Sequence, residues 1–265
     1  MFLTTGKHKL YYDLIGDGPR TACFVHALAA DSGMWAEQVP VVLARGMRVL
    51  RVDLRGHGGS DPVAGDYTLV ELAADIAGLI RSLGLEPVHY VGLSVGGMIG
   101  EAFALKFRNS VASLLLCEAP PASLRNAHEI WAPRMAAAHA ANSLEPIADA
   151  TMERWLTPEF RARNPLRWQQ IRDTVAATTV EGYCGTVAAL SNFDFASELP
   201  KLRIPALVLY GEDDKASSHE ESQRLASLIP GGRFLAFSGA RHLPNVEAPE
   251  RFNAILCDWL DSVAR

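Results

Sequence analysis

The sequence of 265 residues has little positive charge and no long apolar run. Its 25 lysines and arginines are outnumbered by 30 aspartates and glutamates, which gives a formal net charge of −5. Without a basic footprint for phosphate, nucleic acid is not an expected partner. No apolar stretch approaches the ~20 residues of a membrane-crossing helix, and the first residues lack the basic and apolar regions of a signal peptide. We therefore expect a soluble cytoplasmic protein with no membrane partner.

Cysteine is also scarce, and its spacing predicts no chemistry. The cysteines lie far apart and form no C-x-x-C pair; they are Cys23, Cys117, Cys184 and Cys257. Cys23 and Cys117 fall inside apolar runs, where thiols are usually buried and inert. The chain contains no internal repeat and no low-complexity segment. We expect these thiols to be buried and unreactive.

The sequence does contain a regular alternation of strand and helix patterns. With 49% hydrophobic residues, the chain can bury a large core as one domain or as a core with an inserted segment. Short apolar runs predict strands at 21–27, 47–54, 87–93, 111–119, 205–211 and 232–239. The segment 68–83 has the spacing of an amphipathic helix, and Thr68 with Glu71 predicts a capping box at its start. This alternation predicts a mostly parallel sheet covered by helices on both faces, with ligands bound at the carboxyl ends of the strands.

The alternation stops after Pro120–Pro121 and resumes near Pro205. The segment 122–195 contains helical stretches but no convincing strand. Prolines predict breaks between these helices, at Pro133, Pro146, Pro158 and Pro165. We therefore expect a helical cap at 122–195, inserted between two parts of a core domain at 1–121 and 196–265.

The stretch GLSVG, 92–96, places a serine between a predicted strand and a predicted helix. A G-x-S-x-G sequence at such a junction forces the serine into a tight, strained turn, and the glycines let the strand and helix approach closely. The turn exposes the hydroxyl of Ser94, and the helix start offers unsatisfied amides to nearby negative charge. A glycine-rich helix start with a serine cap would have a similar sequence, but the context favours a nucleophile.

A serine nucleophile needs a general base and a third group that orients the base. In folds with this junction, the acid follows a later strand and the histidine comes last in the chain. His242 lies in the loop after the last predicted strand and fits the base. Asp213 and Asp214 follow the strand at 205–211, and Glu118 ends an earlier strand, so three candidates remain for the acid.

Along nearly its whole length the chain resembles the α/β-hydrolase family. HALAADSGMW, 26–35, and DLRGHGGSD, 53–61, match family stretches, and Gly211 with Asp214 matches the family's G-x-x-D. The resemblance favours Asp214 as the acid. It implies an α/β-hydrolase fold with a mostly parallel eight-stranded sheet flanked by helices and an inserted helical cap.

The resemblance also implies an oxyanion hole. In the family this hole is formed by two backbone amides, which correspond here to Leu28 and Val95. Ala27 stands where the family usually has glycine. The loop that carries Leu28 therefore departs from the family pattern at one position.

Within the family, the chain is most similar to 3-oxoadipate enol-lactonases. The similarity is carried by GLSVGGMIG, WAPRMAAAHA, RWLTPEF, EGYCGTVAAL and HLPNVEAPERF, several of which lie in the expected cap. The chain departs from these enzymes at HALAAD, 26–31, where they usually have Asn-Ser-Leu-Gly-Thr-Asp, and at Val95, where they have methionine. Both departures fall at the expected oxyanion hole, so the natural substrate can differ from that lactone.

These features predict a serine hydrolase that cleaves a small ester or lactone through an acyl-enzyme. Ser94, His242 and Asp214 would act as nucleophile, base and orienting acid, and this chemistry needs no metal or cofactor. A carbon–carbon bond hydrolase or a cofactor-free perhydrolase would use the same residues, and a small-molecule receptor could keep them with little turnover. A dehalogenase is disfavoured, because it would need aspartate at position 94. The sequence gives no indication of the oligomeric state.

Three side chains of the expected cap are candidates for substrate binding. Trp131, Met135 and His139 recur every four residues and would share one helix face, which either packs against other helices or lines a pocket. The resemblance implies that Arg134 meets a substrate carboxylate, and the alternative is a solvated arginine. Trp155 is a candidate for an apolar wall. We expect Trp131, Arg134 and Trp155 to contact substrate.

Overall fold

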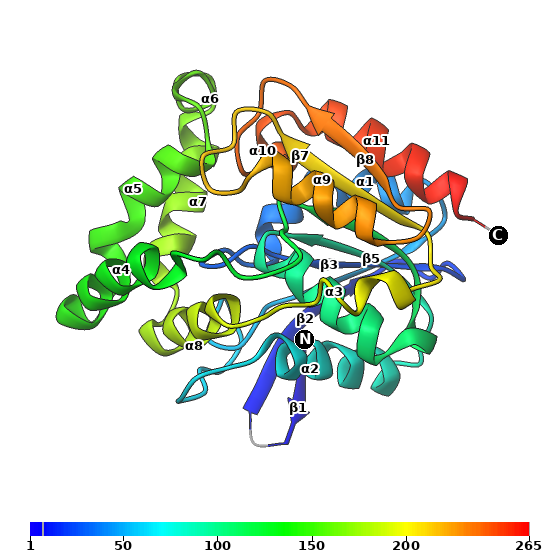
Figure 1. The fold of residues 1–265 in the computed structure, drawn as a ribbon, viewed down its shortest axis with the longest axis horizontal. Helices are drawn as coiled ribbons and strands as arrows, with labels where there is room; N and C mark the ends of the chain where they lie inside the picture. The colour runs from blue at the N-terminus through cyan, green and yellow to red at the C-terminus, as the bar shows by residue number, and fades with distance from the viewer. Residues whose placement is uncertain (7, 265) are drawn as a thin grey trace.

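The computed structural model describes residues 1–6 and 8–264. Within these residues one eight-stranded sheet has the strand order β1-β2-β4-β3-β5-β6-β7-β8 (Figure 1). The strands are β1 (Phe2–Thr5), β2 (His8–Ile15), β3 (Thr21–Val25), β4 (Arg48–Val52), β5 (Val88–Leu93), β6 (Val111–Cys117), β7 (Ala206–Gly211) and β8 (Arg233–Phe237). Strands β3 to β8 pair in parallel, which confirms the mostly parallel sheet and all six strands predicted from apolar runs.

The two amino-terminal strands were not predicted from the sequence. Strand β1 pairs antiparallel with β2, and β2 pairs antiparallel with β4 at the edge of the sheet. Of the residues of β2, only Leu10 and Tyr12 are buried. Strand β2 lies between β1 and β4 in the antiparallel part of the sheet. An antiparallel strand can have only one apolar face, so it lacks the continuous apolar run that marks a central parallel strand.

Helices flank the sheet and build the core. Helix α2 (Leu69–Ser82) buries the predicted stripe, and the capping box at Thr68 and Glu71 is present, with the Glu71 amide donating to Thr68 Oγ1 at 3.2 Å. Helix α2 packs on α3 (Val95–Lys106), and α1 (Val39–Leu43) packs on α11 (Pro249–Ser262). The remaining elements of the sheet domain are α9 (His219–Leu228), α10 (Pro244–Glu247) and short 3-10 helices at Ser32–Trp35, Arg108–Ser110 and Leu199–Lys201. None of the helices in the described part of the chain is long and apolar enough to cross a membrane.

A helical insertion separates β6 from β7. It comprises α4 (Ala127–Ala141), α5 (Glu145–Trp155), α6 (Pro158–Arg163), α7 (Pro165–Ala177) and α8 (Val180–Ser191). Figure 1 shows α4 to α7, in green, to one side of the sheet. The two ends of the insertion lie side by side, because Ala122 and Asp194 form a β-bridge and the Ser123 amide donates to Phe193 O at 2.9 Å.

The prolines of the insertion differ in their effect. Pro146, Pro158 and Pro165 lie in the first turns of α5, α6 and α7, where proline is well tolerated. The predicted break at Pro133 is wrong, because α4 runs through it. Proline in a helix removes a single backbone hydrogen bond and adds a local clash, whereas α4 is held by packing against both α5 and α8.

The loops that follow the central strands are joined at one edge of the sheet. The Ser94 amide donates to Cys117 O at 2.8 Å, and the Glu118 amide donates to Leu209 O at 3.1 Å. The Asp213 amide, in the loop after β7, donates to Ala240 O in the loop after β8 at 3.1 Å. These bonds bring the carboxyl ends of β5, β6, β7 and β8 together, which is where ligands bind in parallel sheets.

Candidate active site

Ser94 occupies a strained turn between β5 and α3. Its backbone has φ 56° and ψ −119°, a conformation that non-glycine residues rarely adopt. A Cβ on Gly92 would lie 2.2 Å from Gly96 O, and a Cβ on Gly96 would lie 2.3 Å from Val25 O. Neither distance is sterically possible, so both flanking positions require glycine. The close approach of strand and helix holds Ser94 in the turn, with its side chain on the wall of a cavity.

His242 and Asp214 form a buried pair beside Ser94. His242 lies in the loop after β8, and its Nδ1 is 2.8 Å from Asp214 Oδ2. Asp214 also accepts hydrogen bonds from the Ala216 amide at 2.7 Å and the Ser217 amide at 3.2 Å. Burial alone would raise the pKa of the Asp214 carboxyl, but the charge and hydrogen bond of His242 outweigh burial and lower that pKa below its usual range. Asp214 is therefore ionised at neutral pH and can orient the imidazole.

The geometry distinguishes the three acids that the sequence left open. The side chain of Asp214 is fully buried against His242, whereas Asp213 is exposed to solvent. Glu118 is buried behind Asp214, where its Oε1 accepts from the Gly211 amide at 2.5 Å. Asp214 is thus the carboxylate in direct contact with His242.

The loop after β3 presents Leu28 to the same cavity. Among the hydrogen bonds of residues 1–6 and 8–264, none uses the backbone amide of Leu28 or of Val95, the first residue of α3. Positive φ in this loop falls at Ala29, at 60°, and not at Ala27. Ala27 therefore fits where the family usually has glycine, because its own backbone needs no left-handed conformation. Two free amide donors next to a nucleophile are what an oxyanion hole requires.

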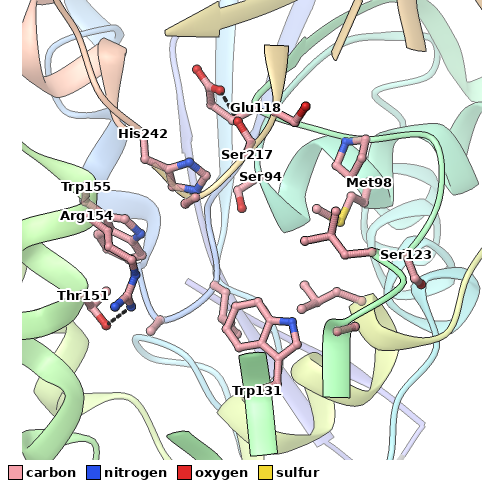
Figure 2. A pocket seen from close by; sticks show the side chains of 18 of the residues that line it. Ser94, Met98, Glu118, Ser123, Trp131, Thr151, Arg154, Trp155, Ser217 and His242 are labelled. Atoms are coloured by element: carbon pink, nitrogen blue, oxygen red, sulfur yellow. Dashed lines mark hydrogen bonds between the residues drawn. The ribbon is translucent and has the colours of Figure 1, made fainter. Parts of the chain in front are cut away.

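The cavity has a volume of about 890 Å³, including the part open to solvent. Ser94 and His242 line this cavity together with Trp131 and Trp155 of the insertion (Figure 2). Arg134 of the insertion lines it as well. The Trp155 ring lies parallel to the His242 imidazole, with 6.2 Å between the ring centres. The Arg134 guanidinium lies over the Trp131 ring at 4.8 Å from its centre. All three insertion residues expected to bind substrate therefore lie at the cavity.

The three residues of the predicted helix face, Trp131, Met135 and His139, have different surroundings. Trp131 lines the cavity, and Met135 packs against the hydrophobic core. His139 is not among the residues that line the cavity, and its Nε2 lies 3.4 Å from Cys184 Sγ. Cys23, Cys117 and Cys257 are buried as expected, whereas Cys184 is half-buried.

Arg154, the residue before Trp155, was not among the predicted substrate-binding residues. Arg154 lines the cavity and donates to Thr151 Oγ1 at 3.0 Å. Burial and the neighbouring charge of Arg134 lower the pKa of Arg154, and burial raises the pKa of the nearby Tyr183 to about 12. Neither arginine forms an ion pair with an acidic side chain in the described residues. The signal in the sequence was an arginine inside the quoted RWLTPEF stretch.

One cluster in the described residues has the composition of a metal site. Ligand atoms of Glu118, Asp214 and His242 all lie within 4.8 Å of one another. Their oxygen and nitrogen atoms already take part in hydrogen bonds, to the Gly211 amide, to Ser217 and to each other. Hydrogen bonding within the protein accounts for the geometry of this cluster.

Comparison with known proteins identifies the family. The family model described as alpha/beta hydrolase fold matches residues 23–249. The chain is an α/β-hydrolase. This finding confirms the family and the fold class expected from the sequence. It also indicates hydrolase activity, because the similar proteins of assigned activity include enol-lactonases and esterases.

Three similar proteins illustrate how far the likeness of this α/β-hydrolase extends. It is 30% identical to 3-oxoadipate enol-lactonase 1 of Acinetobacter baylyi over 93% of its own length and 92% of that relative. The crystal structure of the enol-lactonase from Burkholderia xenovorans matches with a TM-score of 0.93 and 31% identity, over 98% of this chain and 100% of the other. A thermophilic esterase from Thermogutta terrifontis, solved with malate bound, matches with a TM-score of 0.90 and 31% identity over 98% and 96% of the two chains.

Proposed function

We propose that the protein is a serine hydrolase that cleaves a small carboxylate-bearing ester or lactone through an acyl-enzyme. The observation that carries the proposal is the arrangement of Ser94, in its strained turn, on the same cavity as the buried pair of His242 and Asp214. The similarity to enol-lactonases and an esterase supports the choice of ester and lactone substrates.

The proposed reaction is acyl transfer to water. His242 Nε2 takes the proton of Ser94 as the hydroxyl attacks the carbonyl carbon. Asp214 meanwhile accepts a hydrogen bond from Nδ1–H, which holds the imidazole in the productive tautomer. The free amides of Leu28 and Val95 bind the negative charge that develops on the carbonyl oxygen. His242 then returns the proton to the leaving oxygen, and water, activated in the same way, releases the acyl group. Each of these steps uses groups of the chain itself.

The two arginines support an anionic substrate. Arg134 and Arg154 bring two guanidinium groups to one wall of a largely apolar cavity without an acidic partner among the described residues. A guanidinium offers paired N–H donors that match a carboxylate, and its attraction is strong where water is excluded. The indole rings of Trp131 and Trp155 line the same cavity and provide apolar walls beside this charge. A substrate carboxylate would therefore be held at the insertion while the ester carbonyl reaches the serine.

We further propose that 122–195 acts as a cap on a core formed by 1–121 and 196–265. The insertion contributes several walls of the cavity, and the Leu243 amide, next to His242, donates to Trp155 O at 3.3 Å. The cap therefore both encloses the substrate and contacts the histidine loop.

A panel of esters and lactones, with and without a carboxylate, tests the proposed function. The wild type should hydrolyse carboxylate-bearing members with the highest kcat/KM. Ser94→Ala should abolish turnover while keeping the circular dichroism spectrum and unfolding temperature of the wild type. If Ser94→Ala hydrolysed these compounds at wild-type rates, Ser94 would not be the nucleophile. If the wild type bound the esters and lactones without hydrolysing them, the protein would be a receptor.

A further inference from the structure

Glu118 lies directly behind the Asp214 carboxylate. It follows β6 in a left-handed backbone conformation, with φ 54°, and its side chain is fully buried. Its Oε2 lies 2.6 Å from Ser217 Oγ, and the same hydroxyl contacts Asp214 Oδ2. Figure 2 shows Glu118 and Ser217 together beside His242. One hydroxyl group therefore bridges two carboxyl groups.

The number of protons in this bridge is the key to its chemistry. A serine hydroxyl has one hydrogen, so it can donate to one carboxyl oxygen but not to two. The second contact needs a proton on one of the carboxyl groups. Asp214 is poorly placed to carry it, because its Oδ2 faces His242 Nδ1 and its Oδ1 accepts from the Ala216 amide.

Glu118 is placed to carry the second proton. Its Oε1 accepts from the Gly211 amide, as the carbonyl oxygen of a carboxylic acid does, which leaves Oε2 to bear the hydrogen toward Ser217. Burial, and then the negative charge of Asp214, raise the pKa of Glu118 well above its usual value. Two adjacent buried carboxyl groups rarely ionise together.

We propose that Glu118 is a protonated positioning residue: its O–H donates to Ser217 Oγ, and the Ser217 O–H donates to Asp214 Oδ2. The chain of hydrogen bonds adds a donor to Asp214 without adding a second negative charge next to His242. Asp214 keeps its charge and position while the imidazole gains and loses the proton of Ser94. For its effect on catalysis, this role rests on the hydrolase function proposed above.

Substitutions at Glu118 test the role through kinetics. Glu118→Ala removes the O–H that donates to Ser217, so the Ser217 hydroxyl is no longer held toward Asp214. It should lower kcat about 3- to 10-fold, the value of one neutral hydrogen bond, with KM nearly unchanged. Glu118→Gln keeps the pattern of a protonated acid, because its oxygen can accept from Gly211 and its NH2 can donate to Ser217. It should recover most of the activity lost in Glu118→Ala. A merely structural role would lower the unfolding temperature without this division between kcat and KM.

Infrared spectroscopy tests the protonation without relying on activity. The difference spectrum between wild type and Glu118→Gln at neutral pH should contain the C=O stretch of a carboxylic acid. Glu101 provides a matched control, because it is also fully buried and burial raises its pKa, but neither of its carboxyl oxygens has a hydrogen-bond partner among residues 1–6 and 8–264. Glu101→Gln should leave the Glu118 band in place and should not lower kcat.

The outcomes separate this inference from the proposed function. Suppose that the wild type hydrolyses esters. The inference on Glu118 is then overturned, and the proposed function kept, if Glu118→Gln loses no carboxylic acid band or if its kcat is as low as that of Glu118→Ala. A band present in a protein that hydrolyses no ester supports the protonation and removes the function. If Glu118→Ala does not fold, the infrared arm decides.

Discussion

Replacing Asp214 by asparagine should lower kcat about 10⁴-fold by fixing His242 in the wrong tautomer. In the wild type, Asp214 Oδ1 accepts from the Ala216 amide at 2.7 Å, and Oδ2 lies 2.8 Å from His242 Nδ1. Backbone amides donate to both oxygens, but the Ala216 amide makes the shorter bond, whereas the Ser217 amide donates to Oδ2 at 3.2 Å. We therefore expect the carbonyl oxygen of an asparagine to remain on Ala216 and its NH2 to turn toward Nδ1. Nδ1 must then accept a hydrogen bond, and the imidazole proton moves to Nε2. An Nε2 that already carries a proton cannot take the proton of Ser94.

The expected loss is large in kinetics and small in stability. A 10⁴-fold decrease corresponds to about 5.4 kcal/mol of transition-state stabilisation, at about 1.36 kcal/mol for each factor of ten. Asparagine has nearly the same shape as aspartate and keeps its hydrogen bond with the Ala216 amide, so we expect the folded structure to persist. The measurement is kcat/KM for a p-nitrophenyl ester, taken together with the unfolding temperature of each variant.

Asp213→Asn is the matched control for this prediction. Its side chain is the exposed neighbour of Asp214 and makes no contact with His242 among the described hydrogen bonds and ion pairs. It should change kcat/KM by less than about twofold, in line with the small effect of most surface substitutions. The reasoning is refuted if Asp214→Asn retains activity within tenfold of the wild type, or if Asp213→Asn is the more damaging change.

Three further predictions concern charge, pH and packing. In steady-state kinetics, Arg154→Gln should raise KM about 10- to 100-fold for a carboxylate-bearing ester and change KM by less than about twofold for a neutral ester of equal length. Equal increases in KM for both esters would contradict the anion site. The pKa of Glu118 is raised in the folded protein, so its contribution to stability is complete below the usual pKa of 4.5 and is lost as the pH rises toward the folded-state pKa. The pKa of Asp214 is lowered, so its contribution to stability is present above pH 3.8 and is lost in acid. As the pH rises from about 5, the unfolding temperature should therefore fall more steeply in the wild type than in Glu118→Gln, and parallel curves would oppose this. In Gly96→Ala the new Cβ would lie 2.3 Å from Val25 O, so the free energy of unfolding measured with denaturant should fall by about 3 kcal/mol or more. A decrease below about 1 kcal/mol would show that position 96 does not require glycine.

The central part of the fold could be predicted because its strands are buried on both faces. Every residue of β5 and β7 is buried, so their sequences are continuous apolar runs with turn residues at each end. Strand β2, second in the sheet, has no such run, and it pairs with residues of β4 that are about 34 to 40 positions away in the sequence, which local pattern does not reveal. Pro133 shows the same limit in a helix, because packing of α4 outweighs the local preference to break.

The parts of the site that depend on chain order and on turn residues, Ser94 and His242, could be predicted from the sequence. The glycines around Ser94 indicate its strained turn, and the position of His242 follows from the order of elements. Choosing Asp214 over Asp213 depends on which side chain turns inward, and that was available only through resemblance to the family. The contribution of Arg154 depends on how α5 is oriented over the cavity. The bridge between Glu118 and Asp214 depends on tertiary hydrogen bonds through Ser217, for which the sequence has no local signal.

Covalent labelling by a fluorophosphonate, followed by peptide mass spectrometry, tests the central claim most directly. The reagent forms a stable adduct only with a serine that a neighbouring base has activated. We predict one adduct for each chain, on the peptide that contains Ser94, with labelling abolished in Ser94→Ala and greatly slowed in His242→Ala. An adduct on another residue, or undiminished labelling of Ser94→Ala, would contradict the account.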